Sequence, residues 1–406
     1  MADNALHIKQ ALSGSPLRKP AHAAVFAIFL FMLLAMGMYN LLWPLYGGAP
    51  RMIQTFAFGA LIAIVASLPA IALVWFLDRR EHEWPFLLIS AALWGAVVSA
   101  SLSTLLGTAV YGYFLRLAKQ MGGTFFGLSA ETATSVFAIP VVEEIIKGIA
   151  ILLLFWLLRG DFDDLRDGII YGAMVGLGFN AAQYAVFLLE GFAATGAPPY
   201  LSLGALQFVF FGINGHFIYS AMLGAGFGLA RQVQDARLKK FAPLAGLALA
   251  LLANILANSV GTKILNDLVR AWTGERLLLA TTPALIVWLA TAISTLAAQF
   301  WAYILLAIAV HWSERWEVET IRRHLFSEVG VSVTPDEYVL IEQDAPFKGR
   351  AVPGYTKKIA TEILDAQDEL AYRKWRVEEE GGDVENDELV RAWRDHIAHL
   401  RMSAQH

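Results

Sequence analysis

The chain of 406 residues is 57% hydrophobic and only 16% charged, which is too apolar for a soluble protein and typical of a chain that crosses a membrane several times. It contains no cysteine, so disulfides, thiolate metal sites and a cysteine nucleophile are excluded. Its formal net charge of −4 argues against a nucleic-acid partner.

Eight apolar segments follow one another along the chain, and most exceed the ~20 residues needed to span the hydrocarbon of a bilayer. They cover residues 22–46, 53–77, 85–112, 132–158, 167–194, 203–230, 240–262 and 277–311. The sequence therefore predicts an all-α polytopic membrane protein, with about eight transmembrane helices embedded in the lipid bilayer over residues 22–311. A polar N-terminal segment, residues 1–21, precedes them and is expected to be cytoplasmic.

Lysine and arginine are concentrated before the first apolar segment and in every second loop after it. These residues are Lys9, Arg18, Lys19, Arg79, Arg80, Arg159, Arg166, Arg231, Arg237, Lys239 and Lys240. Positively charged loops remain on the cytoplasmic side of a membrane. We therefore expect a multi-pass protein of the cell inner membrane with both termini in the cytoplasm.

After residue 311 the chain becomes rich in charged residues, with apolar residues at helical spacing. Trp316, Ile321 and Leu325 extend the last apolar segment as a helix, and Thr334-Pro335 is a typical helix start. Two more amphipathic helices, separated by an acidic break at residues 378–383, are outlined by Ile359, Ile363, Leu364 and Leu370 and by Leu389, Trp393, Ile397 and Leu400. We expect a small helical cytoplasmic domain over residues 312–406, of the kind that regulates a protein or forms homo-oligomers.

Residues 138–150 place two carboxylates and a lysine inside an apolar run. A charge at the centre of a lipid-embedded helix costs at least ~2.5–3.5 kcal/mol, so three of them close together indicate a functional site. Glu143 and Lys147 are four apart and are expected to pair on one helix face, which leaves Glu144 without a partner in its own helix. A purely structural ion pair is the alternative, but it does not explain Glu144.

Three later segments carry polar residues at membrane depth. These are Asn180 and Gln183 in the fifth segment, His216 near the middle of the sixth, and Asn254 and Asn258 in the seventh. Amides often only join neighbouring helices. At ~1.5 Å per residue, however, Gln183, His216 and Asn254 fall at the level of Glu144, between the midplane and the outer interface. One polar cavity, open toward the extracytoplasmic side, would collect them.

These motifs, in this order, resemble the PrsW family of intramembrane proteases, relatives of the CAAX prenyl-protease and bacteriocin-processing group. The likeness covers roughly residues 135–262. The matching motifs are Glu143-Glu144-Ile145-Ile146-Lys147, the stretch Gly178 to Tyr184, the histidine helix from His216 to Gly226, and the pair Asn254 and Asn258. The resemblance implies an intramembrane endopeptidase that cleaves membrane-anchored protein or peptide substrates.

Two motifs depart from the family pattern. Gln183 and Tyr184 stand where the second family motif has an acid and an asparagine, and Asn254 stands where many relatives have histidine. Only Glu143, Glu144 and His216 remain as strong ligands, and catalytic zinc normally takes three protein ligands. Because amide oxygens are poor substitutes, we expect no metal cofactor, with zinc as the disfavoured alternative, although the family is often described as metal-dependent.

Peptide hydrolysis needs a base for the attacking water, an acid for the leaving amine and a donor for the oxyanion. We expect Glu144 to be the base and His216 to share the water or protonate the amine. Asn254 or Gln183 would donate to the oxyanion, while Glu143 would pair with Lys147 and hold the helix. Residues expected to contact the substrate or oxyanion, or to support these groups, are Lys147, Asn180, Gln183, Tyr219 and Asn258.

Two other functions are compatible with the sequence. A catalytically degenerate pseudoprotease would keep the fold and the cavity and bind or scaffold membrane proteins, with Gln183 and Asn254 marking the lost catalysis. A small-solute transporter is less favoured, because the sequence has no internal repeat with paired broken helices.

Overall fold

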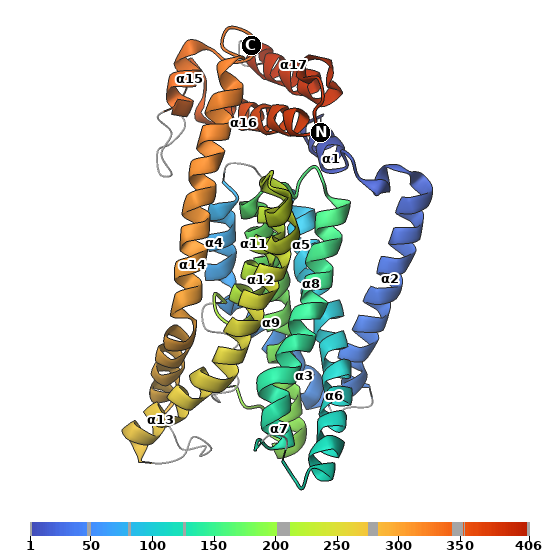
Figure 1. Cartoon of the computed structure of the whole chain (residues 1–406), viewed down its shortest axis with the longest axis vertical. Coiled ribbons are helices and arrows are strands. Elements are labelled where there is room, and N and C mark those ends of the chain that lie inside the picture. The colour runs from blue at the N-terminus through green and yellow to red at the C-terminus, as the bar shows by residue number, and fades with distance from the viewer. Residues whose placement is uncertain are drawn as a thin grey trace.

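The computed structural model describes residues 2–46, 50–79, 83–124, 127–200, 212–274, 283–342, 352 and 354–403. Within these ranges the regular structure is helical, apart from an isolated bridge between Val329 and Val333, so the predicted all-α class is confirmed. A bundle of helices carries a further group of helices that lies across one end (Figure 1). The N- and C-terminal ends of the chain both lie at that end of the bundle.

Helices occupy the described parts of all eight predicted segments. In chain order the bundle contains α2 (Pro20–Leu42), α3 (Pro50–Ala66), α4 (Leu68–Leu77), α5 (Pro85–Leu93), α6 (Ala100–Gln120), α7 (Ala130–Ala133), α8 (Ile139–Leu157), α9 (Leu165–Thr195), α11 (His216–Gln232), α12 (Ala236–Leu256), α13 (Thr262–Thr273) and α14 (Ala284–Phe326). Three π-helical stretches, Trp94–Ser99, Thr134–Ala138 and Ala257–Gly261, join α5 to α6, α7 to α8 and α12 to α13. The fourth segment therefore passes through a π-helical stretch before α8 begins.

Among the described residues, five helical runs are long and apolar enough to cross a membrane. They are Pro20–Leu42, Pro85–Gln120, Leu165–Thr195, Ala236–Thr273 and Leu285–Phe326, and α3 with α4, bent by 40°, would form a sixth. The other two predicted spans correspond to α8 and α11, which are not among these runs. Helix α8 carries three charged side chains, and α11, with 17 residues, is short for crossing a bilayer. The protein is thus a multi-pass membrane protein, and the number eight stays a prediction.

The sixth predicted segment, residues 203–230, is not one helix through His216. Residues 201–211 and Arg80 lie outside the described part of the chain. Within it, Gly212 and Gly215 have φ angles of +67° and +57°, a conformation that interrupts a right-handed helix. The expectation that His216 lies in the middle of one continuous helix is therefore wrong, because His216 is the first residue of α11.

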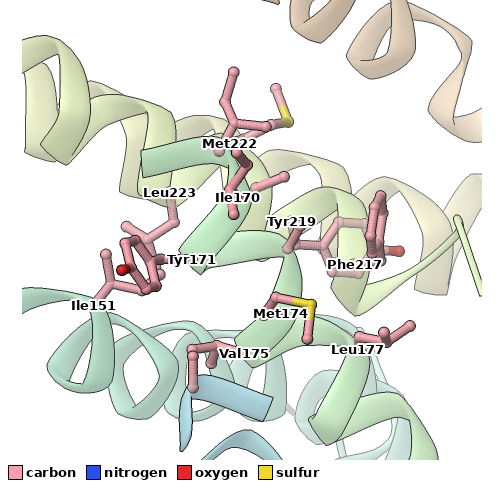
Figure 2. Packing of buried hydrophobic residues seen from close by; sticks show 14 of the residues in the cluster. Ile151, Ile170, Tyr171, Met174, Val175, Leu177, Phe217, Tyr219, Met222 and Leu223 are labelled. Atoms are coloured by element: carbon pink, nitrogen blue, oxygen red, sulfur yellow. The ribbon is translucent and has the colours of Figure 1, made fainter. Parts of the chain in front are cut away.

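Helix α9 is the centre of the bundle, and α2 lies at its edge. Over their most apolar 18 residues, α9 is 78% buried and α2 is 6% buried. Glycines on α9 and α11 allow the two backbones to approach closely, since a Cβ atom on Gly172 would collide with the backbone of Ser220. Large apolar side chains fill the space around this contact (Figure 2), among them Ile151, Ile170, Tyr171, Met174, Val175, Phe217, Met222 and Leu223.

Acidic side chains organise the start of α9. The Oδ1 atom of Asp164 accepts hydrogen bonds from the N–H groups of Arg166 and Asp167. The Oδ2 atom of Asp167 in turn accepts a hydrogen bond from the N–H group of Asp164. This capping box satisfies N–H groups that lack helical partners. Burial raises the pKa of Asp164, against the opposing effect of Arg166. Asp163 pairs with Arg376, which ties the start of α9 to the C-terminal helices.

The C-terminal helices are α15 (Pro335–Glu342), α16 (Lys357–Glu379) and α17 (Glu388–Ser403), and α14 continues to Phe326 as expected. Helix α15 begins at the predicted proline, and α16 ends before Gly381, whose φ is +70°. The N-terminal helix α1 (Ala2–Ala11) packs on this group, because Gln10 accepts a 2.6 Å hydrogen bond from Trp393 Nε1 and donates a 2.7 Å bond to Glu369. The N-terminal and C-terminal segments therefore share one folded unit.

We expect Gly172→Ala to lower the stability of the protein, because the added methyl group forces α9 away from α11, at a cost of roughly 1–3 kcal/mol. Gly112→Ala on α6 is the matched control, since no atom lies within 4 Å of the position its Cβ atom would take. Alanine there should be neutral or stabilise the helix by up to ~1 kcal/mol. Thermal unfolding of the purified proteins in detergent compares the two. Equal melting temperatures would contradict the close α9–α11 packing.

Candidate active site

A polar cavity of about 380 Å³ lies among α8, α9, α11, α12, α13 and α14. The structure brings seven of the predicted site residues to its wall: Glu143, Asn180, Gln183, His216, Tyr219, Asn254 and Asn258. Glu144 and Lys147 are fully buried and are not part of the wall. Polar side chains from four separate apolar segments thus converge on one space inside the bundle.

The buried lysine pairs with Glu144, so the expected pairing of Lys147 with Glu143 is wrong. The Nζ atom of Lys147 donates a 2.7 Å hydrogen bond to Glu144 Oε1, across three positions of α8. Both side chains have 0% exposed surface, so each charge depends on the other for compensation. Residues three apart and residues four apart both share a helix face, so Glu144 and Glu143 compete for Lys147. The additional hydrogen bond of Lys147 to His216 favours the side of Glu144.

Glu143 is the carboxylate that faces the cavity. Its Oε2 atom lies 3.9 Å from His216 Nε2 and accepts a 3.2 Å hydrogen bond from Asn254 Nδ2. Its Oε1 atom lies 3.5 Å from Gln183 Nε2. Gln183, which replaces an acid of the family pattern, therefore presents an N–H donor to Glu143 instead of a second negative charge.

His216 connects the buried lysine to the cavity. Its Nδ1 atom lies 3.0 Å from Lys147 Nζ, and its ring packs edge-on against Phe179 with the ring centroids 4.5 Å apart. An ammonium group can only donate, so Nδ1 accepts and the proton of the neutral ring is on Nε2. The Nε2–H group of His216 then faces Glu143 Oε2, at a distance too long for a direct hydrogen bond.

Asn254 joins the two carboxylates through its amide nitrogen. Its Nδ2 atom donates to Glu144 Oε1 at 2.8 Å and to Glu143 Oε2 at 3.2 Å. Its oxygen accepts a 3.0 Å bond from Asn258 Nδ2, so the amide is held with its donors toward the acids. Two neighbouring carboxylates need donors of this kind, and an amide supplies them where a neutral histidine would offer only one.

Sequence reasoning missed a polar stripe on α14. Thr291, Ser294, Thr295 and Gln299 all line the cavity. Gln299 accepts a 3.2 Å hydrogen bond from the N–H of Gly215 and donates a 3.0 Å bond to Tyr219 Oη, which fixes the break before α11. The signal was available, because positions i, i+3, i+4 and i+8 of an apolar helix share one face.

The ligand atoms of Glu143, Glu144 and His216 lie within 4.8 Å of one another, so the group could hold a metal ion. Its bonds do not fit a catalytic zinc site, which normally takes three protein ligands. Oε1 of Glu144 already accepts from Lys147 and Asn254, and its Oε2 atom, which has no hydrogen-bond partner, belongs to a side chain that has no exposed surface and does not line the cavity. With Lys147 bonded to Nδ1 of His216, the Nε2 atom carries a proton and has no free lone pair. Among these three residues, Glu143 is the one ready ligand on the cavity wall.

Two comparisons, with curated proteins and with solved structures, give no match. The family model described as PrsW family intramembrane metalloprotease matches residues 82–289, about half of the chain. This range runs from the start of α5 into α14 and contains Glu143, Glu144, His216 and Asn254. The match agrees with the motifs read from the sequence, and the chain belongs to the PrsW family of intramembrane metalloproteases.

Proposed function

We propose that this protein hydrolyses peptide bonds of membrane-anchored proteins inside the bilayer, with a water molecule that is held between Glu143 and His216 and activated by Glu143. The observation that carries the proposal is the pair of atoms Glu143 Oε2 and His216 Nε2. They lie 3.9 Å apart on the wall of a polar cavity, in a chain of the PrsW family. A water molecule can bridge two groups at such a separation with hydrogen bonds to both.

Glu143 is the proposed base, in place of Glu144. Glu143 faces the cavity, whereas Glu144 is buried and bonded to Lys147. Glu143 takes a proton from water as the water oxygen attacks the scissile carbonyl carbon. It then passes that proton to the amide nitrogen as the C–N bond breaks, which returns the carboxylate to its starting state.

His216 acts as a neutral donor in this scheme. Its Nε2–H group polarises the scissile carbonyl and stabilises the oxyanion, as a preorganised donor. Asn254 and Gln183 hold Glu143 in place through their N–H groups. Lys147 fixes the tautomer of His216 and compensates the charge of Glu144. No step passes through a metal ion, since the donor set does not fit one.

The substrate is proposed to be a membrane-anchored protein or peptide that enters the cavity in an unwound form. Backbone groups freed from a helix at membrane depth need polar partners. Hydroxyl groups of Ser294 and Thr295 on α14 and the amide of Asn258 line the cavity and can supply them. The C-terminal helices lie too far along α14 to line this cavity, and for residues 312–406 we propose a regulatory or self-association role.

We place the protein in the inner membrane with both termini in the cytoplasm. Two observations support this orientation: the basic residues of alternate loops, and the packing of α1 against α17 through Gln10 and Trp393. A reporter enzyme fused after His406 should be active only in the cytoplasm. Activity of that fusion in the periplasm would contradict the orientation.

The proposed chemistry predicts different outcomes for the two neighbouring acids. Glu143→Gln should lower cleavage of a single-span substrate by about 10²–10⁴-fold while leaving the melting temperature near that of the wild type, because an amide cannot accept a proton from water. Glu144→Gln should lower stability by roughly 3 kcal/mol or more, because it leaves the charge of Lys147 buried without compensation. Product formation and thermal unfolding of the purified proteins measure both effects.

Cleavage assays with a chelator, and with zinc added back, test whether the reaction proceeds without a metal ion. Cleavage should persist in chelator, and loss of product that returns with zinc would show that the metal-free scheme is wrong. If the wild type binds several substrates as tightly as Glu143→Gln does and neither yields product, the protein is a pseudoprotease that binds membrane proteins.

A further inference from the structure

A second cavity, distinct from the catalytic one, lies at the edge of the bundle between the N-terminal helices and α5 and α8. It has a volume of about 250 Å³, and its walls are almost entirely apolar. Side chains from α1, the connection to α2, α2 itself, α5 and α8 form it, including Leu12, Leu17, Phe26, Trp84, Leu154 and Leu158. In a membrane protein such a space at the edge of the helices is accessible to lipid tails.

Two exposed arginines directly follow residues that line this cavity. Arg18 directly follows the lining residue Leu17, and Arg159 directly follows Leu158. Arg159 also approaches the connection between α1 and α2, since its Cδ atom lies 3.6 Å from the position that a Cβ atom on Gly14 would take. Within the described part of the chain, Arg18 and Arg159 are exposed and form no ion pair.

A third arginine adds to this positive charge. Arg231 at the end of α11 stacks on Phe155, with its guanidinium carbon 4.0 Å from the ring centroid. Burial and the neighbouring charge of Arg159 lower the pKa of Arg231 to about 10, with only Glu380 acting in the opposite direction. An apolar cavity thus opens beside a cluster of positive charge that the protein leaves mostly uncompensated.

We propose that this site binds one anionic phospholipid, with an acyl chain in the cavity and the phosphate between Arg18 and Arg159. Guanidinium groups recognise phosphate oxygens in a planar, two-pronged geometry. Basic pockets between transmembrane helices on the cytoplasmic side are suited to anionic head groups. The bound lipid would join α2, which is otherwise 6% buried, to α5 and α8.

A transmembrane helix of a substrate fits the cavity less well. Two turns of a helix ~10 Å across occupy on the order of 800 Å³, against the 250 Å³ present here. The positive-inside rule accounts for basic residues at this end of the bundle, but it does not require them beside an apolar cavity. Basic residues at the same end but away from the cavity, Lys239 and Lys240 in the first turns of α12, therefore make a matched control.

Native mass spectrometry of the purified full-length protein tests the proposal. The protein is offered equimolar phosphatidylglycerol and phosphatidylcholine with the same acyl chains. We expect the wild type to retain one molecule of phosphatidylglycerol in preference to phosphatidylcholine. The double variant Arg18→Gln/Arg159→Gln should bind it about 30-fold more weakly, on the basis of two phosphate-contacting charges. The control Lys239→Gln/Lys240→Gln removes the same charge and should retain the lipid.

Two further measurements test the binding of the acyl chain and of the head group separately. Leu154→Trp fills the cavity and should reduce retention of the lipid, whereas soluble glycerol phosphate should not displace it. Equal retention of the two lipids by the wild type, or equal losses in both double variants, would overturn the proposal. So would unchanged binding to Leu154→Trp. Displacement of the lipid by a single-span peptide would show that the cavity belongs to a protein partner instead.

Discussion

The arrangement of the catalytic cavity depends on one buried cation, the ammonium group of Lys147. Placing it at membrane depth is costly unless an anion compensates it, and Glu144 does so at 2.7 Å. The same ammonium group bonds to His216 Nδ1 at 3.0 Å, which sets the tautomer of the ring and directs its N–H toward the cavity. The ammonium group of Lys147 therefore pairs with Glu144 and orients His216, which leaves Glu143 as the carboxylate available for chemistry.

Close packing of backbones brings these groups together. Gly172 on α9 and the facing turns of α11 approach without side chains between them, and the positive φ of Gly215 ends the preceding chain so that α11 starts at His216. Gln299 holds that start from α14, a helix that continues without interruption to Phe326 and the C-terminal helices. The site and the C-terminal unit are thus connected by one rigid element.

Much of this could be predicted from the sequence, because hydrophobic periodicity and charge at membrane depth are strong signals. The helical class, the helices around Trp393 and Pro335, and the convergence of Gln183 and Asn254 on His216 agree with the structure. The choice of partner for Lys147 could not be predicted, since spacings of three and four both share a helix face and a contact from another helix decided between them. The helix break at Gly215 was missed because glycine is tolerated within membrane helices as well as at their ends.

The central claim is that Glu143, and not Glu144, faces the polar cavity. Because the chain contains no cysteine, single-cysteine variants can be labelled with a small water-soluble thiol reagent without further engineering. We expect Glu143→Cys to react more slowly than Asn258→Cys, an exposed position on the cavity wall, but far faster than Glu144→Cys, whose position has no exposed surface. Faster labelling of Glu144→Cys than of Glu143→Cys would contradict the assignment of the two acids and the role given to Lys147.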